Sequence, residues 1–486
     1  MFVIKRFRYV IALLIFNSTL ACYIGRINLS TAIVEMAKKT TMNRTDIDNW
    51  PRDVCYDTNE PFPINNSSLS TATTIKPATI VSDGSAPRFD WSEKTQGILL
   101  GAFFWGYFLM MVPGGRIAET HGPRLLLTFG MVMTGLINLL TPFMAPLFYV
   151  FVASRVVLGL SQAIVFPGCY ALVSNWIPEH ERSTVLALTS VGGSIGTIIT
   201  SSMSGYLCKH GFAGGWPSVF YVTGIICIVM GIISYLMVTN HPGNHPMISS
   251  DELLYIKENM PKSQTVKSDT RFPWKAVLTS VPVIAEICAK LCMTWVYSFV
   301  ILKAPSYMEK VLRMPLERNG MFSSLFFVAN SISLLLSGIF ADWIIQRKVF
   351  RSKTIVRKIF EGISVFGTGL SLAFIPLADC NETFFLSIMI LSQIAFGMQA
   401  GGELPLPSDM SNEYSATIFA INNMCGMSMA FVGPFITGMI LDMEPTMPKQ
   451  QWSYIIYFTV AFNMVGGLIF SIFASAELQN WTRSKS

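Results

Sequence analysis

The sequence predicts an all-α membrane protein with twelve transmembrane helices in two pseudosymmetric six-helix halves. Of its 486 residues, 51% are hydrophobic and only 13% are charged, and the mean hydropathy is +0.48. In a soluble domain about a quarter of the residues are charged. Many apolar runs reach the roughly 20 residues that a helix needs to cross a bilayer. In addition, motifs of the first half of the chain recur in the same order in the second half.

The apolar runs define the expected spans and the organisation of the chain. The spans are expected at residues 9–36, 95–117, 124–144, 147–170, 184–207, 217–238, 277–302, 320–343, 357–377, 384–407, 415–441 and 452–474. We therefore expect an N-terminal half over residues 1–238, a cytoplasmic linker over 239–276 and a C-terminal half over 277–486.

Two long connections carry sidedness signals. The first, at about 37–94, is polar and holds three glycosylation acceptors, which are used only on the outer or lumenal side: Asn43, Asn65 and Asn66. The linker is expected to contain a short amphipathic helix that begins with a capping box of Ser249 and Glu252. Three cysteines fall in or near outer loops and leave one unassigned disulfide open: Cys55, Cys208 and Cys380.

Three pairs of spans carry matched motifs. Residues 115–119 match 338–342, residues 154–159 match 392–397, and Thr184 matches Thr417. Such pseudosymmetry is typical of secondary transporters, whose substrate site lies between the halves near the midplane of the membrane.

The basic residues indicate the orientation of the chain. A cluster of them after the eighth span is interpreted as a cytoplasmic anchor: Arg347, Lys348, Arg351, Lys353, Arg357 and Lys358. The net charge of +6 lies mostly in loops, so it does not indicate a nucleic-acid partner. We expect both termini in the cytoplasm. The short N-terminal tail shows no acidic dileucine sorting signal, which favours the plasma membrane over a lysosomal or vesicular membrane.

Two arginines interrupt apolar runs at the same expected depth. Arg26 stands in the first span and Arg155 in the fourth, each about 12–14 Å below the outer face at ~1.5 Å per residue. A charge near the middle of the bilayer costs roughly 2.5–3.5 kcal/mol on insertion scales. Guanidinium groups bind carboxylate or phosphate bidentately. We therefore predict that Arg26 and Arg155 bind an anionic solute; the alternative, a structural ion pair, has no evident acidic partner in the first six spans.

Neighbouring polar residues extend this predicted site. Gln162 lies seven residues after Arg155, so both share a helix face that is expected to point at the cavity. Asn28 and Tyr107 are expected either to donate neutral hydrogen bonds to the substrate or simply to be packed.

Three charged residues in the second half are candidates for coupling. Glu286 and Lys290 are four residues apart in the seventh span and are expected to pair with each other, with a proton or cation site as the alternative. Glu403 in the tenth span has no evident partner, and an intramembrane carboxylate is a functional hypothesis in itself. It is expected to carry a proton, bind Na+ or reach Arg155 from the opposite half.

Four charged residues at the inner ends of the spans are expected to make contacts that hold one conformational state: Arg116, Glu119, Arg124 and Asp342.

The segment 115–124 resembles the loop motif of the major facilitator superfamily between its second and third spans. More narrowly, the chain resembles the anion:cation symporter family of sialin, the vesicular glutamate transporters and the type I sodium–phosphate cotransporters. The residues that carry this resemblance are Arg26-Ile27-Asn28-Leu29-Ser30, Gln96-Gly97, Phe103-Phe104-Trp105-Gly106-Tyr107, Pro113-Gly114-Gly115, Phe166-Pro167, Trp176-Ile177-Pro178-Glu179-His180-Glu181-Arg182-Ser183, Asn319-Gly320 and Glu477-Leu478-Gln479-Asn480-Trp481. The resemblance implies the major facilitator fold and alternating access.

The departures from that family bear on the driving ion and the substrate. Proton-coupled relatives carry a glutamate where this chain has Gln162, so Na+ or the membrane potential is favoured over protons, although Glu403 leaves proton coupling open. Glutamate carriers have a histidine at the position of Leu100 and an arginine at that of Met293, which argues against a vesicular glutamate role.

Together these features predict a secondary active transporter of small organic or inorganic anions, such as phosphate, urate-like or carboxylate solutes. No enzymatic activity, cofactor or metal site is expected; Na+ or H+ is the expected coupling ion, and the monomer is the expected functional form. Two alternatives stay open: a proton-coupled, sialin-like lysosomal exporter of acidic sugars, and an anion sensor that does not transport.

Overall fold

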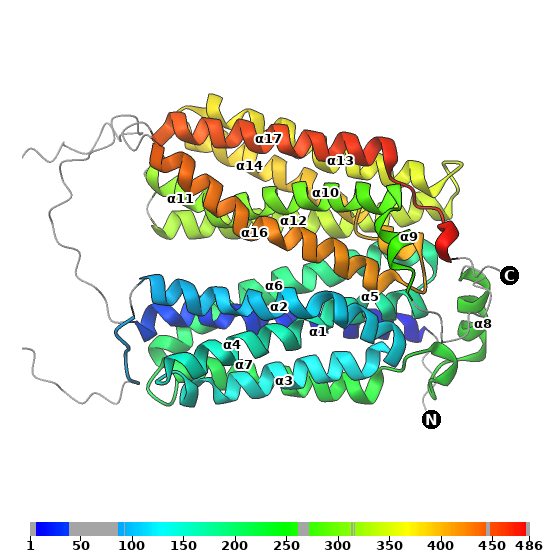
Figure 1. The fold of residues 1–486 in the computed structure, drawn as a ribbon, viewed down its shortest axis with the longest axis horizontal. Helices are drawn as coiled ribbons and strands as arrows, with labels where there is room; N and C mark the ends of the chain where they lie inside the picture. Colours follow the sequence, from blue (N-terminus) through cyan, green and yellow to red (C-terminus); the bar gives the residue numbers. More distant parts are fainter. Residues whose placement is uncertain are drawn as a thin grey trace, which may run out of the picture.

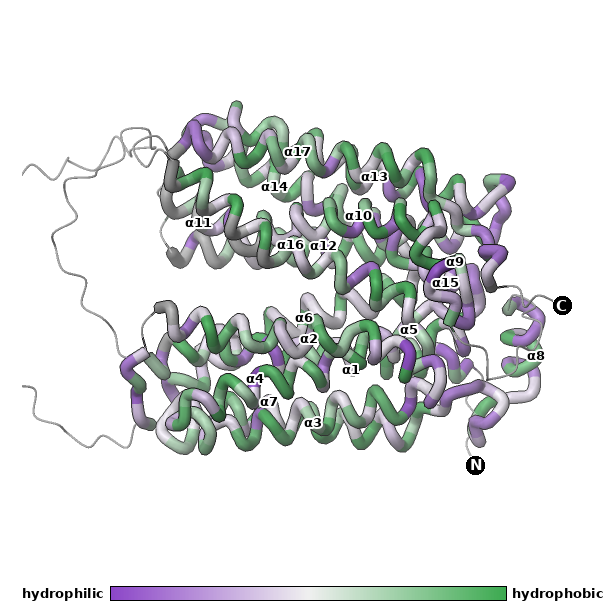
Figure 2. The backbone as a smooth tube through the Cα atoms, in the orientation of Figure 1, coloured by the Kyte–Doolittle hydropathy of each residue, from purple (hydrophilic) through white to green (hydrophobic). Residues whose placement is uncertain are grey.

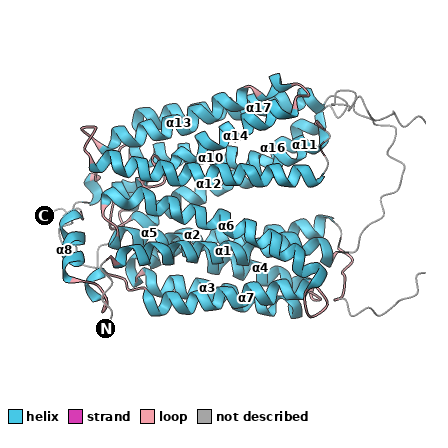
Figure 3. Ribbon diagram, turned by 180° about the vertical axis from the view of Figure 1, so that it is seen from behind, coloured by secondary structure: helices cyan, strands magenta, loops and turns pink. Residues whose placement is uncertain are grey.

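Helices make up the regular structure of the described residues, apart from one isolated bridge between Ala37 and Phe89 (Figure 3). The structure is a computed structural model that describes residues 6–37, 86–91, 93–260, 272–312, 314, 316–443 and 448–482. In this part of the chain, eleven helical spans are long and apolar enough to cross a membrane. Helix α16, with 29 residues, occupies the position of the remaining span. The predicted twelve-helix fold is confirmed.

The spans form two bundles that lie side by side (Figure 1). The N-terminal half contains α1 (Phe7–Met36), α2 (Glu93–His121), α3 (Pro123–Met144), α4 (Phe148–Ala163), α5 (Val165–Trp176), α6 (Arg182–His210) and α7 (Trp216–Met237). The C-terminal half contains α10 (Val281–Ser298), α11 (Ala304–Lys310), α12 (Leu316–Gln346), α13 (Lys353–Ala373), α14 (Glu382–Gly397), α15 (Leu406–Met410), α16 (Ser415–Met443) and α17 (Pro448–Phe473). Two short helices, α8 (Ser250–Asn259) and α9 (Trp274–Leu278), lie between the halves in sequence.

The two ends of the molecule differ. The described chain begins at Arg6 and finishes at Thr482 at one end, which also carries α8 and is called the terminal end below (Figure 1). The opposite end, called the far end, is where α1 finishes and α2 begins. The predicted glycosylation acceptors Asn43, Asn65 and Asn66 lie outside the described residues. Cys380 forms a disulfide bond, whereas Cys208 has a free thiol.

The outer faces of the bundles are apolar, as a lipid environment requires. On α3, four large side chains that share one face are 42–57% exposed: Leu125, Phe129, Leu136 and Leu140. Figure 2 shows hydrophobic residues along the spans and hydrophilic ones gathered at the terminal end. Soluble monomers rarely expose so large a continuous apolar surface. The chain is therefore a multi-pass membrane protein.

The predicted fourth span, 147–170, is not one straight helix. It consists of α4 and α5, with Ile164 between them. The cause is Pro167, whose ring would clash with the carbonyl group four residues earlier, that of Ala163, where α4 ends. The predicted continuous helix is wrong in this respect, although the span itself exists.

The predicted tenth span, 384–407, is also interrupted. Helix α14 ends at Gly397, one turn of 3-10 helix covers Met398–Ala400, and residues 401–405 form turns before α15 begins at Leu406. Gly401 and Gly402 weaken a helix, and Pro405 cannot donate the backbone hydrogen bond that would extend it. The predicted seventh span, 277–302, likewise divides: α9 ends at Leu278, α10 follows from Val281, and a π-helical turn at Phe299–Lys303 leads into α11.

Helix α8 is the amphipathic helix predicted for the linker. Its N-cap is Ser249, whose hydroxyl accepts a hydrogen bond from the backbone N–H of Glu252 at 3.2 Å. The second half of the expected capping box is missing, because the Glu252 carboxylate turns to α1. It accepts hydrogen bonds from the backbone N–H groups of Phe7 and Arg8 at 2.6 and 3.1 Å and from the Arg8 side chain at 3.2 Å. The linker is thus tied to the first residues of α1.

The N-terminal half contains one particularly close helix crossing. A Cβ atom added to Gly106 of α2 would lie 1.9 Å from the carbonyl oxygen of Val156 on α4, and one added to Gly159 of α4 would lie 1.9 Å from that of Phe103 on α2. Any side chain at either position would separate the two helices. This crossing holds Tyr107 and Arg155 against α1.

Candidate functional site

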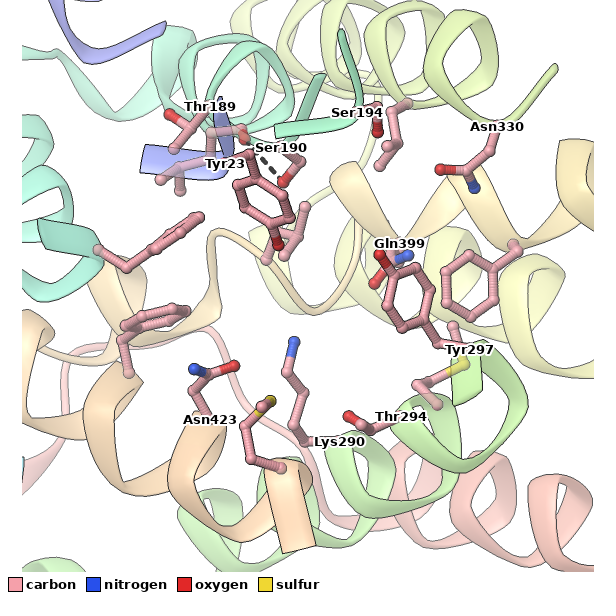
Figure 4. A pocket seen from close by; sticks show the side chains of 18 of the residues that line it. Tyr23, Thr189, Ser190, Ser194, Lys290, Thr294, Tyr297, Asn330, Gln399 and Asn423 are labelled. Carbon is pink, nitrogen blue, oxygen red and sulfur yellow. Dashed lines mark hydrogen bonds between the residues drawn. The ribbon is translucent and has the colours of Figure 1, made fainter. Parts of the chain in front are cut away.

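A cavity of about 200 Å³ lies between the two halves. The N-terminal half lines it with residues of α1, α2, α5 and α6, and the C-terminal half lines it mainly with residues of α10, α12 and α16. Two charged residues line it in the described part of the chain, Arg26 on α1 and Lys290 on α10, and both are basic. Figure 4 shows the amine of Lys290 pointing into the open space, with Asn423, Thr294 and Tyr297 around it.

Arg26 sits in a cage of aromatic rings. The centre of its guanidinium lies 4.8 Å from the Tyr23 ring, 4.7 Å from that of Phe103 and 4.8 Å from that of Tyr107. Its Nε donates to the side-chain oxygen of Gln162 at 3.1 Å, and its buried Nη2 has no hydrogen-bond partner within the described ranges. Aromatic faces attract a cation without neutralising its charge. The rings thus hold the arginine in place and leave its positive charge unneutralised.

Arg155 lies behind Arg26 rather than on the cavity wall. It is 2% exposed, and its closest polar contact is a long one of 3.5 Å from Nη2 to the backbone oxygen of Arg26. Its Nε and Nη1 have no partner in the part of the chain that is described. The structure therefore brings the two predicted arginines together, but only Arg26 lines the cavity.

Gln162 also faces away from the cavity. Besides accepting from Arg26, it donates from Nε2 to the backbone oxygen of Cys22 at 3.1 Å. The helix face that it shares with Arg155 packs against α1, so the expectation that this face lines the cavity is not met. The reason is the kink at Ile164, beyond which α5 instead contributes Phe166 and Tyr170 to the cavity wall.

Asn28 and Tyr107 have different positions. Asn28 is fully buried within the N-terminal half, where its amide donates to Asn138 at 2.6 Å and to Thr223 at 2.9 Å. Those bonds tie α1 to α3 and α7, and Asn28 is absent from the cavity wall. Tyr107 lines the cavity, and its ring faces Arg26. Of the two expectations for Asn28, packing fits the structure.

The candidate coupling residues pair differently from the prediction. Lys290 binds Glu403, with its Nζ at 3.0 Å from Oε1 and 3.2 Å from Oε2, and does not pair with Glu286. Glu286 is fully buried, and among the described residues neither of its carboxylate oxygens has a hydrogen-bond partner. Glu403 therefore has a partner, contrary to the sequence analysis, and this partner is Lys290 instead of Arg155. The interruption of the tenth span brings Glu403 close to α10. The continuous helix expected from the sequence does not predict this contact.

Two carboxylates join the halves at the terminal end, and we call their contacts the crossed latch. Glu119 of α2 accepts hydrogen bonds from the backbone N–H and the hydroxyl of Thr417 in the first turn of α16, both at 2.7 Å. Asp342 of α12 accepts from the backbone N–H of Ser183 at 3.2 Å and from the N–H and hydroxyl of Thr184 at 2.7 Å, in the first turn of α6. Carboxylates are favoured at helix N-termini because unpaired N–H groups point at them.

The basic residues expected to act with these carboxylates differ in role. Arg116 pairs with Glu119 at 2.7 Å. Arg124 bonds within its own half, donating to the backbone oxygen of Tyr235 at 2.9 Å. Arg357, assigned from the sequence to a surface anchor, is only 1% exposed; it pairs with Asp409 at 2.8 Å and donates to the Ser183 hydroxyl of the other half. Arg357 lies near the start of α13 and faces the other half, and this position explains the error.

Sequence reasoning missed most of the polar cavity wall. The missed residues are Thr189, Ser190, Ser194 and Thr197 on α6, together with Asn330, Gln399 and Asn423 from the C-terminal half. The four on α6 follow a helical period, so they form one polar stripe on the cavity side of that span. That stripe is the signal that could have identified α6 as a cavity helix.

The comparisons with known proteins agree with this architecture. Residues 15–434 match the family model described as Major Facilitator Superfamily. A solved proton:xylose symporter of this superfamily shares the fold with a TM-score of 0.67 over 98% of each chain, at 13% identity.

Curated relatives narrow the family. A Drosophila melanogaster protein named "Putative inorganic phosphate cotransporter" is 30% identical over 98% of this chain and 86% of its own length. Human sialin is 29% identical over 98% of this chain and 90% of its own length. Vesicular glutamate transporter 3 of Danio rerio is 28% identical over 98% and 74%. The chain thus belongs to the major facilitator superfamily and, within it, to the anion:cation symporter family.

Proposed function

We propose that this protein is a secondary active transporter that moves small anions across a membrane by alternating access. The observation that carries the proposal is the charge of the cavity: its described wall holds Arg26 and Lys290 and no carboxylate. A cavity with two cations, one from each half, attracts an anion and gives it a partner on both sides. The named functions of the relatives, which include phosphate cotransport and sialin, support the same class of solute.

Arg26 is the residue best placed to hold the anion. Its guanidinium has an unpaired donor, and its ring cage fixes the side chain without a competing carboxylate. Arg155, buried directly behind it, adds positive potential in surroundings of low dielectric. The small cavity favours compact solutes, such as phosphate, urate-like rings and short carboxylates.

The crossed latch supports a mechanism of alternating access. It closes the terminal end in this conformation, and Figure 1 shows the helices of the two halves diverging toward the far end. Breaking the latch while the far ends approach each other would expose the same cavity to the opposite side.

We also propose that the terminal end faces the cytoplasm and that the protein works at the plasma membrane as a monomer. Exposed basic residues at the terminal end, among them Lys348 and Arg351, support this orientation through the positive-inside rule. Surface biotinylation of cells that express the full chain tests the membrane assignment, and glycosidase treatment of Asn43, Asn65 and Asn66 variants tests which side the connection 37–94 occupies.

Uptake by the purified full chain in liposomes tests the transport function. Labelled phosphate, urate, sialic acid and glutamate would be offered separately, each under an imposed Na+ gradient, membrane potential or pH gradient in turn. We expect saturable uptake of at least one anion under one of these gradients, and its loss in Arg26→Gln. Saturable binding without uptake would instead establish the sensor alternative. The absence of both binding and uptake would refute the proposal.

A further inference from the structure

The interruption of the tenth span places a carboxylate beside the cavity. Glu403 lies in the turns between α14 and α15, close to Leu404, which lines the cavity. Gly402 allows these turns to pack closely against Glu361 of α13, because a Cβ atom at position 402 would lie 2.6 Å from the Glu361 carboxylate and 2.7 Å from the Glu361 backbone nitrogen. Interrupted helices near the midplane often form the ion sites of secondary transporters.

The ion pair of Lys290 and Glu403 joins this interruption to the cavity. The Glu403 residue is 3% exposed, whereas the Lys290 side chain is 13% exposed and its amine points into the open space (Figure 4). An ammonium group has three hydrogen-bond donors. Lys290 can therefore contact Glu403 and a solute in the cavity from the same nitrogen atom.

The groups around Glu403 leave its charge dependent on Lys290. Glu361 of α13 accepts a hydrogen bond from the backbone N–H of Glu403 at 3.0 Å, and its other oxygen has no partner in the part of the chain that the structure describes. Tyr170 of α5 donates its hydroxyl to the backbone oxygen of Leu404 at 3.0 Å. Arg357 forms an ion pair with Asp409 and donates to the backbone oxygen of Gly401, and it does not pair with Glu403.

Glu286 of α10 completes the cluster. Asn422 lies beside it, yet neither Glu286 oxygen has a partner of good hydrogen-bond geometry in the described part of the chain. With all three carboxylates ionised, three negative charges would face one ammonium, for a net charge of −2. A buried ionised carboxylate without hydrogen bonds is very unfavourable, so Glu286 is neutral in this conformation. Glu403 is thus the carboxylate whose ionisation Lys290 supports.

We propose that Lys290 is shared between Glu403 and the transported anion, so that one proton binds to Glu403 for each anion that binds in the cavity. This inference rests on the proposed function. When an anion takes hydrogen bonds from Lys290 and Arg26, the Lys290 charge no longer compensates the Glu403 carboxylate alone, and this carboxylate takes a proton from the water of the cavity. On the other side of the membrane the anion leaves, the proton returns to water, and the ion pair forms again. The sequence analysis favoured Na+ or the membrane potential as the driving force; we propose a proton gradient in their place.

Two transport modes of the full chain in liposomes distinguish proton coupling from anion binding: accumulation driven by a pH gradient, and exchange of labelled for unlabelled anion. The probe is whichever of phosphate, urate, sialic acid and glutamate the unchanged protein takes up, with an internal dye to record proton entry. For Glu403→Gln we expect that accumulation driven by the pH gradient and proton entry fall at least about tenfold, while exchange of labelled for unlabelled anion stays within about threefold. For Lys290→Gln we expect both modes to fall at least about tenfold, because the anion loses a partner.

Glu286→Gln is the matched control, since it makes the same substitution in the same cluster at a carboxylate that is already neutral. We expect proton entry per anion to stay unchanged in it. If Glu286→Gln abolishes proton entry while Glu403→Gln keeps it, the proposal is wrong, because the proton then resides on Glu286.

A measurement on the unchanged protein covers the case in which Glu403→Gln does not fold. In weakly buffered detergent solution, binding of the same anion should take up about one proton, and affinity should rise as the pH falls, because binding and protonation favour each other. Anion transport without proton uptake, or driven by Na+ alone, would overturn this inference and leave the proposed function intact. No transport of any of the four anions would overturn both.

Discussion

At the scale of single residues, the two buried arginines differ in what they can do. Arg26 lines the cavity and keeps one buried donor without a partner in the described part of the chain, whereas Arg155 is enclosed and almost without hydrogen bonds. The sequence located both, because a charge inside an apolar run is visible in any hydropathy profile. It could not show which one reaches the solute, since that depends on how α4 turns against α1.

Arg26→Lys should lower anion uptake at least about tenfold, because a lysine cannot form the planar, bidentate contact of a guanidinium. The protein should still reach the membrane in normal amounts. Initial rates of uptake into liposomes give the answer. Arg88→Lys is the matched control, since Arg88 is 52% exposed in its side chain and pairs with Glu35 away from the cavity; it should transport normally. Equal rates for both variants would exclude Arg26 from the site.

Arg155→Met should separate stability from function. Removing a buried cation with two unsatisfied donors is expected to stabilise the folded protein by about 1–3 kcal/mol. Anion uptake should nevertheless fall, because the positive potential behind Arg26 is lost. Thermal unfolding of the purified protein and liposome uptake test the two effects. A less stable variant with normal uptake would show that Arg155 is a structural residue.

At the scale of elements, the interruptions of the fourth and tenth spans position the site. The sequence contains residues that disfavour helix in both spans, Pro167, Gly401, Gly402 and Pro405. The apolar runs around them are nevertheless long enough for continuous helices. Hydropathy records length and polarity but not the direction of a helix after a proline. The pairing of Lys290 with Glu403 was therefore beyond prediction, while the spans themselves were not.

Gly402→Ala should lower the unfolding midpoint and the uptake rate, because the added methyl group overlaps the backbone nitrogen and carboxylate of Glu361. Gly205→Ala makes the same change on α6, where a Cβ meets nothing within 4 Å. This control should be neutral or slightly stabilising, by up to about 1 kcal/mol, since alanine favours helix. Thermal unfolding followed by size-exclusion chromatography compares them; equal midpoints would contradict the crowding at Gly402.

At the scale of the whole molecule, the crossed latch reflects the internal repeat. The sequence matched residues 115–119 with 338–342 and Thr184 with Thr417, and the structure shows that each acidic residue binds the helix start of the opposite half. The repeat was readable in the sequence. The crossing was not, because it follows from how the two halves dock.

The two arms of the latch should open together. Glu119→Gln changes only one arm of the latch: it weakens the contact with Thr417 and removes the ion pair with Arg116. Rigid halves cannot separate at one arm alone, so amide exchange should also quicken around Thr184 at the start of α6. Hydrogen–deuterium exchange with mass spectrometry measures both regions. Glu258→Gln, an exposed change on α8, is the control and should leave exchange at both sites unaltered. Faster exchange at Thr417 alone would show that the arms act independently.

The interrupted tenth span also bears on how the chain is made. Helix α14 has 16 residues and so measures only ~24 Å at ~1.5 Å per residue, less than the ~30 Å of a bilayer core. The missing length is supplied by the turns that carry Glu403, a segment poorly suited to enter lipid alone. We therefore expect the tenth span to settle at full depth during biosynthesis only once α10 and α13 are present, because Lys290 and Glu361 contact the turn that carries Glu403. Its insertion and the assembly of the C-terminal half are therefore one event.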